Sequence, residues 1–394
     1  MENNNHKSIK ACFYLQRTFV RVGHAMAKNF QETYGVNNFC ALVATRWSYN
    51  YLLEQKDINY TSLLLEEDIH NNYREEKLDY EYLKKLEKEY GLPNLWPYLM
   101  VDRVLMNGQL VREYPYDQAQ YNHEDLMKIL QVTAKNIIKF LDEQKPDFIF
   151  FAVIGNINSY LLYEIAKKRG IKVIVGEMSR FPDSYMITNN FQKFEWTEKY
   201  WQQLQSGQKI INLEMENKIK NYINNFNNKP ITYNSVDSPK KQPINRRRQF
   251  RFLLPKNWLK SIKGLRQIFY EYYFGAQKND YSAIKPWGYI IDRIKRKLRM
   301  LRGFEDLYDK INEKEDFVYF SLSVEPEIAL LLYAPFATNQ INIIKNIASS
   351  LPLHYKLYVK EHPSMMGYRP RRFYKEIKKC LMSNLSSRKL LVLN

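Results

Sequence analysis

Apolar and polar positions alternate in blocks along the first third of the chain, and the blocks predict strands separated by helices. Continuous apolar runs at 9–15, 39–44 and 60–65 predict strands. The segments 18–32 and 47–55 between these runs have the spacing of amphipathic helices. Runs of this kind, rather than a strict alternation, are typical of strands that are covered on both faces of a parallel sheet.

A clearer α/β unit follows after a less regular stretch. The pattern predicts a long amphipathic helix at 123–144, a strand at 147–154, a helix at 159–168 and a strand at 171–175. Strands that alternate with helices of this length indicate a parallel sheet with helices on both faces. The sequence therefore predicts that the first domain is α/β and Rossmann-like, and that it occupies residues 1–227.

Residues 228–243 are rich in Asn, Pro and Ser and predict a linker. Together with a basic helical segment, this linker is expected to fill residues 228–315. The α/β pattern resumes after it, with strands predicted at 317–322, 354–359 and 389–393 and helices within 335–350 and at 371–382. A nucleotide-binding domain of this kind normally has five or six strands, so we expect residues 316–394 to form a partial second Rossmann-like domain that is cut short.

The positive charge of the chain is concentrated in one segment. The chain has a net charge of +18, and residues 240–302 contain 18 Lys and Arg residues against three acids. Apolar residues lie between the charges in two predicted helices, 257–273 and 287–302. In the first of these helices, Trp258, Leu259, Ile262, Leu265, Ile268 and Phe269 interleave with Lys260, Lys263 and Arg266. This pattern favours attachment to an anionic membrane surface, with a groove for an anionic glycan as the second interpretation. Nucleic acid is not expected, because no nucleic-acid-binding motif is present.

The remaining composition narrows the class of protein. The three cysteines, Cys12, Cys40 and Cys380, have no CxxC spacing, which argues against a disulfide framework and against a structural zinc site. The first residues lack the apolar core of a signal peptide. No run of about 18 apolar residues predicts a membrane span. We therefore expect a cytoplasmic protein that is peripheral at the inner face of the cytoplasmic membrane.

The segment 360–370, KEHPSMMGYRP, holds the densest set of chemical groups. It follows a predicted strand, and ligands bind at the carboxyl ends of strands in parallel α/β sheets. Pro363 favours an extended backbone at His362. The segment combines a cation, a carboxylate, an imidazole, a hydroxyl and a guanidinium, at Lys360, Glu361, His362, Ser364 and Arg369.

Two landmarks in this half of the chain carry a resemblance to a family. Glu325-Pro326-Glu327 and the later KEHP with Gly367 and Arg369 resemble bacterial capsule and surface-polysaccharide biosynthesis proteins, which are glycosyltransferases of GT-B-like fold related to Kdo transferases. The resemblance covers about 60 residues, from 317 to 379. It implies two Rossmann-like domains and a reaction that uses a nucleotide-sugar donor, CMP- or UDP-linked, and no further cofactor.

The resemblance also implies roles for particular residues. His362 would contact the phosphate or ribose of the donor, with Lys360 as a counter-charge and with Glu361, Ser364 and Arg369 as further donor-binding residues. Glu325 and Glu327 would follow the first strand of the second domain, where one of them positions an acceptor hydroxyl. We expect no bound metal, because the sequence has no DxD motif.

The first domain is expected to supply the acceptor side and a catalytic base. Glu177, in the loop GEMSRFPDS, is the candidate for that base. Further candidates at predicted strand ends are Arg180, Asp183, Glu66, Asp68, Asn156 and Asn158, whereas His24, His70 and His123 are expected to be ordinary packed, loop and cap residues.

These patterns lead to one hypothesis and two alternatives. The chain is expected to be a glycosyltransferase that acts on a glycan or a lipid-linked acceptor. A non-catalytic, membrane-associated scaffold derived from such an enzyme is the first alternative. A nucleotide-sugar epimerase on the same architecture is the second.

Overall fold

The computed structural model describes residues 9–108, 120–179, 184–228, 250–251, 254–275, 281, 283–309, 312, 314–382 and 390–393. The described residues form two compact units. The first unit takes those of Met1–Met106, Ala119–Ile211 and Asn279–Ser282, and the second takes the remainder. The predicted linker at 228–243 lies outside the described residues except for Asn228, so the predicted domain boundaries stay predictions.

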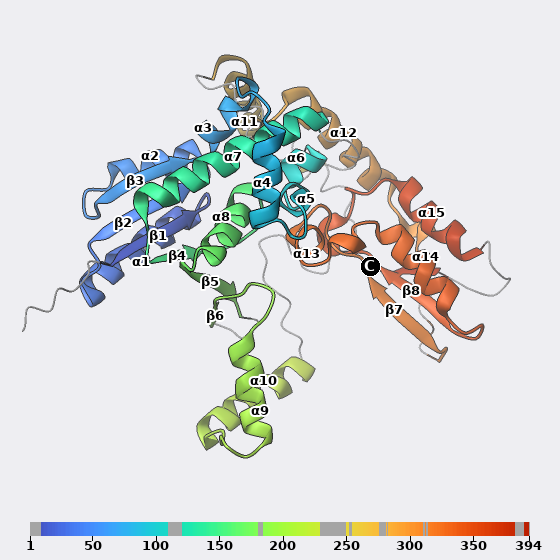
Figure 1. Cartoon of the computed structure of the whole chain (residues 1–394). Helices are drawn as coiled ribbons and strands as arrows, with labels where there is room; N and C mark the ends of the chain where they lie inside the picture. Colours follow the sequence, from blue (N-terminus) through green and yellow to red (C-terminus); the bar gives the residue numbers. More distant parts are fainter. Residues whose placement is uncertain are drawn as a thin grey trace, which may run out of the picture. The chain divides into compact units, whose positions relative to one another are not determined.

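The first unit is built on a six-stranded sheet of order β3-β2-β1-β4-β5-β6 (Figure 1). The strands are β1 (Lys10–Leu15), β2 (Asn38–Val43), β3 (Tyr60–Leu65), β4 (Phe148–Phe151), β5 (Lys172–Met178) and β6 (Tyr185–Thr188). All neighbouring pairs are parallel except β5 and β6, which are antiparallel. The predicted parallel α/β architecture is therefore confirmed for this unit, and the antiparallel edge strand β6 is an addition to it.

Helices cover both faces of this sheet. The helices of the unit are α1 (Phe19–Tyr34), α2 (Arg46–Glu54), α3 (Glu66–Asn71), α4 (Tyr80–Tyr90), α5 (Trp96–Met100), α6 (Arg103–Asn107), α7 (His123–Gln144), α8 (Ile157–Lys168) and α9 (Glu195–Gln205), with a short 3-10 turn η1 at Asn72–Arg74. Helix α9 buries none of its residues and does not take part in this cover. Helix α7 has the bounds that the sequence predicts. Helix α3 begins at Glu66, where the sequence analysis saw only the acidic end of a strand.

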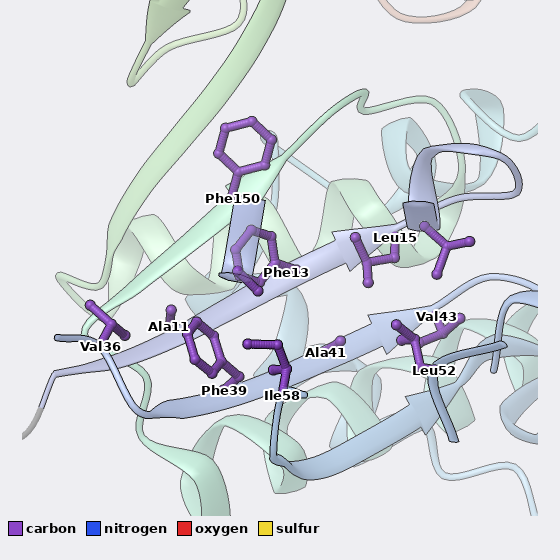
Figure 2. Close-up of a cluster of buried hydrophobic side chains, with 12 residues drawn as sticks. Ala11, Phe13, Leu15, Val36, Phe39, Ala41, Val43, Leu52, Ile58 and Phe150 are labelled. Carbon is purple, nitrogen blue, oxygen red and sulfur yellow. The ribbon is translucent and has the colours of Figure 1, made fainter. Parts of the chain in front are cut away.

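The alternation of side chains explains how the sheet is covered. Figure 2 shows Phe13 of β1 and Phe39 of β2 in one buried cluster, which also contains Val20 of α1 and Leu52 of α2. The intervening residue Tyr14 belongs to the opposite face, where Phe151 of β4 contacts Tyr163 of α8. Both faces of the central strands are apolar because both are packed under helices.

The second unit contains a smaller parallel sheet. Its strands β7 (Phe317–Ser321), β8 (Lys356–Lys360) and β9 (Leu390–Leu393) lie in the order β7-β8-β9. Its helices are α10 (Leu213–Asn228), α11 (Pro255–Phe274), α12 (Pro286–Arg302), α13 (Ile328–Leu331), α14 (Gln340–Ser350) and α15 (Arg371–Met382), and its 3-10 turns are η3 (Glu305–Leu307), η4 (Pro335–Ala337) and η5 (Pro363–Met365). The predicted helices and strands of this half are confirmed.

The core of the second unit joins its sheet to its last helices. Leu357 and Val359 of β8 pack with Ile344 of α14 and Tyr374 of α15. In contrast, α10 and α11 bury no side chain completely. No helix in the described parts of the chain combines the length and apolar character that a membrane crossing needs.

Candidate functional site

The loop 360–370 lies at the carboxyl end of β8, the middle strand of the second sheet. Lys360 is the last residue of β8 and pairs with Ser321 of β7. The chain then makes the short turn η5 and reaches α15 at Arg371. Parallel α/β sheets bind ligands at this edge, so the fold puts the loop where the sequence analysis expected a ligand site.

A buried ion cluster holds the loop against the segment that follows β7. Arg369 has no exposed surface and Glu361 is 3% exposed, and their side chains are directly paired. Arg369 Nη2 lies 3.2 Å from Glu325 Oε2 and donates to the backbone carbonyl of Ser323 at 2.7 Å. One guanidinium therefore ties together the two landmarks of the sequence, Glu325-Pro326-Glu327 and KEHP.

Further hydrogen bonds fix Glu361 within this cluster. The Tyr374 hydroxyl donates to Glu361 Oε2 at 2.6 Å, and the backbone N–H of His362 donates to Glu361 Oε1 at 2.6 Å. Burial raises the pKa of Glu361, and the nearby Glu325 charge adds to this, while Arg369, Tyr374 and the His362 amide oppose it. The carboxylate is thus stabilised by its partners, and removing any of them would leave a buried charge.

The ring of His362 has a defined role in the loop. Its Nδ1 accepts a hydrogen bond from the backbone N–H of Ser364 at 3.2 Å. An accepting Nδ1 implies that the neutral imidazole carries its proton on Nε2. His362, Lys360 and Ser364 are all half-buried. The orientation of the ring within the loop is therefore fixed by Ser364.

The structure changes the assignment of two predicted donor-binding residues. Glu361 and Arg369 were expected to face the donor, but both are enclosed and paired with each other. Because a fully buried pair has no surface for a ligand, we assign them to positioning the loop. Glu325 is also engaged, by Arg369 and by the amide of Gln340. Glu327 is the N-cap residue of α13 and is half-buried.

A second polar cluster lies in the first unit, where the strand order reverses between β1 and β4. The Tyr14 hydroxyl of β1 lies 2.5 Å from Glu66 Oε1 and 2.9 Å from Asn156 Oδ1. Asn156 Nδ2 donates to Glu66 Oε2 at 3.1 Å, and Gln16 Nε2 donates to the Tyr14 hydroxyl at 2.8 Å. A reversal point of this kind forms the ligand crevice in open α/β sheets.

The hydrogen bonds of this cluster accommodate a protonated Glu66. The Tyr14 hydroxyl has one proton but faces two acceptor oxygens, so it cannot donate to both. A proton on Glu66 resolves this, because Glu66 then donates to Tyr14 while Tyr14 donates to Asn156. Burial raises the pKa of Glu66 to about 8, and the nearby charge of Asp102 adds to this, while the hydrogen bonds with Tyr14 and Asn156 oppose the rise.

Asp102 anchors the neighbouring part of this cluster. Its Oδ1 accepts from the backbone N–H groups of Val104 and Leu105, at 2.9 and 3.2 Å. Its Oδ2 accepts from the Ile157 N–H at 3.2 Å and from the Tyr281 hydroxyl at 2.7 Å. Burial raises the pKa of Asp102, and these four donors oppose the rise. Asp102 thereby fixes the first residue of α8, next to Asn156.

Sequence reasoning found Glu66 and Asn156 but missed the residues that surround them. Tyr14 lies in an apolar run that predicts only a strand, and Asp102 lies in a stretch without a regular pattern. His70 was expected to be a loop residue. It is instead buried in α3 beside the rings of Tyr121 and Tyr281. The one signal available in the sequence was the hydroxyl of Tyr14, which lies near the carboxyl end of an apolar run.

The other candidates of the first unit do not join this cluster. Asp68 pairs with Arg46 at the surface. Glu177 is the penultimate residue of β5 and is paired with Met186 of β6 in the sheet. Asn158 is buried in α8, and His24 packs against Asp57 and Tyr60 as expected. The prediction that His123 caps α7 is wrong, because Asn122 is the N-cap and His123 is the first residue of the helix. Arg180 and Asp183 lie outside the described residues.

Among the described residues, no three His, Cys, Asp or Glu side chains gather in a way that could hold a metal ion. A surface pocket of about 130 Å³ is lined by Tyr80, Leu83, Lys84, Glu87, Leu95, Trp96 and Met127. None of these seven residues is a predicted site residue, so the pocket adds nothing to the two clusters.

Comparison with known proteins leaves the function open. No family model matches the chain, and no curated protein matches it. Among solved structures, the chain is similar to UDP-GlcNAc 2-epimerase from Neisseria meningitidis bound to UDP-GlcNAc, with 10% sequence identity and a TM-score of 0.24, over 98% of this chain and 72% of that one. A TM-score this low carries no argument, so the α/β assignment rests on the two sheets described above.

Proposed function

We propose that the protein is a glycosyltransferase of surface-polysaccharide biosynthesis, of GT-B-like architecture. It would transfer a sugar from a nucleotide-sugar donor, CMP- or UDP-linked, to a glycan or lipid-linked acceptor. The observation that carries this proposal is the loop 360–370, which lies at the carboxyl end of a parallel strand and is held there by a buried ion cluster.

The donor would meet the accessible residues of this loop. His362 has its Nδ1 engaged by Ser364 N–H, which orients Nε2–H as a hydrogen-bond donor. Lys360 supplies a positive charge at the strand end, and a departing nucleotide phosphate is the group on which negative charge develops. Glu361 and Arg369 would act indirectly, by keeping this loop in one conformation.

Each unit contains carboxylates that could contact the acceptor. In the second unit we propose Glu327, the half-buried N-cap residue of α13, as the carboxylate that positions an acceptor hydroxyl. Glu325 is paired with Arg369 and Gln340. In the first unit, Gln16 and Asn156 are the half-buried edge of the Glu66 cluster, and Glu177 stays the candidate for the base. Glu66 itself is only 3% exposed, so we assign it to positioning Asn156.

Titration of the full chain with CMP and UDP tests this proposal. We expect binding of at least one of them, and we expect His362→Ala to weaken it about tenfold, which corresponds to the loss of one hydrogen bond to a charged group. The matched control is His354→Ala, because His354 is exposed in the same unit and should not affect binding.

The outcomes separate the transferase from its alternatives. Absence of binding to either nucleotide would refute the transferase and favour a scaffold. Equal affinities of the two histidine variants would refute the role of His362. If a nucleotide-sugar binds, its products decide the reaction class, because a transferase releases the nucleotide and an epimerase returns an altered nucleotide-sugar.

A further inference from the structure

Helix α12 has two faces with different surroundings. On one face, Arg299 Nη1 donates to the backbone carbonyl of Gly367 at 3.1 Å and also bonds the carbonyl of Tyr368. The guanidinium of Arg296 lies over the Tyr368 ring, 4.2 Å from its centroid. Met300 lies against Gly367, where an added Cβ atom would come within 2.8 Å of its sulfur. This face of α12 therefore braces the loop 360–370.

The opposite face of α12 is an exposed apolar stripe. The spacing of its four residues, i, i+4, i+7 and i+11, puts them on one side of a helix. They are Trp287, Ile291, Ile294 and Leu298, with exposed fractions of 60%, 49%, 52% and 60%. Soluble proteins seldom leave a continuous apolar stripe without a partner, so we regard the stripe as a docking surface.

The charge around the stripe indicates which partner covers it. The helix contains six Lys or Arg residues and one acid, Asp292. Asp292 is buried and paired with Arg296 at 2.7 Å. The exposed charges beside the stripe, Arg293, Lys295 and Arg302, are therefore all positive. An apolar stripe bordered by long cationic side chains fits an interface between acyl chains and anionic headgroups.

We propose that the stripe on α12 seats the protein on an anionic lipid bilayer, with the loop 360–370 on the far side of the helix. The separation would be about one helix diameter, roughly 10–12 Å. Resting on the proposed transferase function, this geometry selects a membrane-borne, lipid-linked glycan as the acceptor, because its headgroup would lie at the height of the loop. The basic segment 240–302, which the sequence analysis assigned to a membrane surface, also contains α11. Leu259 of α11 is exposed, and Phe269 of α11 packs against Trp287 at one end of the stripe.

Flotation of the full chain with vesicles tests the docking surface. We expect binding to vesicles of phosphatidylcholine with about one third phosphatidylglycerol at low salt, and weak binding to pure phosphatidylcholine. Leu298→Glu should lower the partition coefficient at least about tenfold. Leu353→Glu is the matched control, since Leu353 is a 65% exposed leucine in the same unit. Leu259→Glu, in α11, tests the rival helix and should have the smaller effect.

Two results would overturn the proposal. One is an absence of binding to anionic vesicles, which would leave the stripe to a protein partner. The other is a larger loss with Leu259→Glu than with Leu298→Glu. The orientation has its own measurement: a spin label at Ser364→Cys should be relaxed by nickel chelated to lipid headgroups when vesicles are added, and an unchanged label would refute it.

Vesicle flotation is measured without a nucleotide, so the proposed docking surface and the proposed transferase function can be refuted independently of each other. Vesicle binding without nucleotide binding would remove the transferase and keep the docking surface. Nucleotide binding without vesicle binding would keep the transferase and remove the membrane-borne acceptor.

Discussion

Replacing Glu66 with Gln tests whether this buried side chain is a neutral acid. The pKa of Glu66 is raised to about 8 in the folded protein, whereas an unfolded chain has a Glu pKa of about 4.3. Between these values the folded protein binds a proton that the unfolded chain has lost. The contribution of Glu66 to the free energy of unfolding must therefore fall as the pH rises from about 4.5 towards 8, and this contribution is complete only below about pH 4.5.

The magnitude follows from the two pKa values. Each pH unit within this window changes the free energy of unfolding by about 1.4 kcal/mol for one proton. From pH 5 to pH 8 the Glu66 contribution to stability should thus fall by about 3 kcal/mol. Gln resembles the protonated acid: its amide can donate to Tyr14 and its carbonyl can accept from Asn156, so the variant keeps the hydrogen bonds of the cluster.

Urea denaturation of both proteins at pH 5, 6, 7 and 8 measures this difference. We expect the Gln variant to match the wild type at pH 5 and to be about 3 kcal/mol more stable at pH 8. Glu75→Gln is the control, because Glu75 is exposed and its variant should follow the wild-type pH dependence. Parallel curves for Glu66→Gln and the wild type would show that Glu66 is ionised in the folded protein and that Tyr14 donates its proton to it.

Two further predictions concern the loop 360–370. Arg369→Met should destabilise the protein by about 3–5 kcal/mol, because it leaves buried carboxylates without their positive partner. Arg372→Met, at an exposed position of α15, should change the melting temperature little. Equal melting temperatures for the two variants would argue against the ion cluster. Gly367 has φ = +80° and faces Met300, so Gly367→Ala should cost about 1–3 kcal/mol. Gly264→Ala, in α11 with open space around it, should instead stabilise the protein by about 0.5–1 kcal/mol. Urea denaturation measures both variants, and changes of the same sign in their free energies of unfolding would contradict this prediction.

Much of the secondary structure was determined by local sequence. The helices α7 and α15 begin and end where the hydrophobic period predicts, and the Asn122 side chain caps the first turn of α7 by accepting from the Asp125 N–H at 2.8 Å. The apolar runs of β1 and β4 also predicted their burial on both faces. These features depend on neighbours within a few residues, which the sequence displays directly.

The candidate sites were decided by tertiary structure. Tyr14, Glu66 and Asn156 lie 52 and 142 residues apart in sequence, counted from Tyr14, and only the strand order brings them together. The pKa of a carboxyl group depends on burial and on such distant partners, and neither can be read from its own segment. For the same reason the sequence predicted the 360–370 loop as a site but could not show that Glu361 and Arg369 are buried against each other. The charges are visible in the sequence, and only packing decides which of them pair.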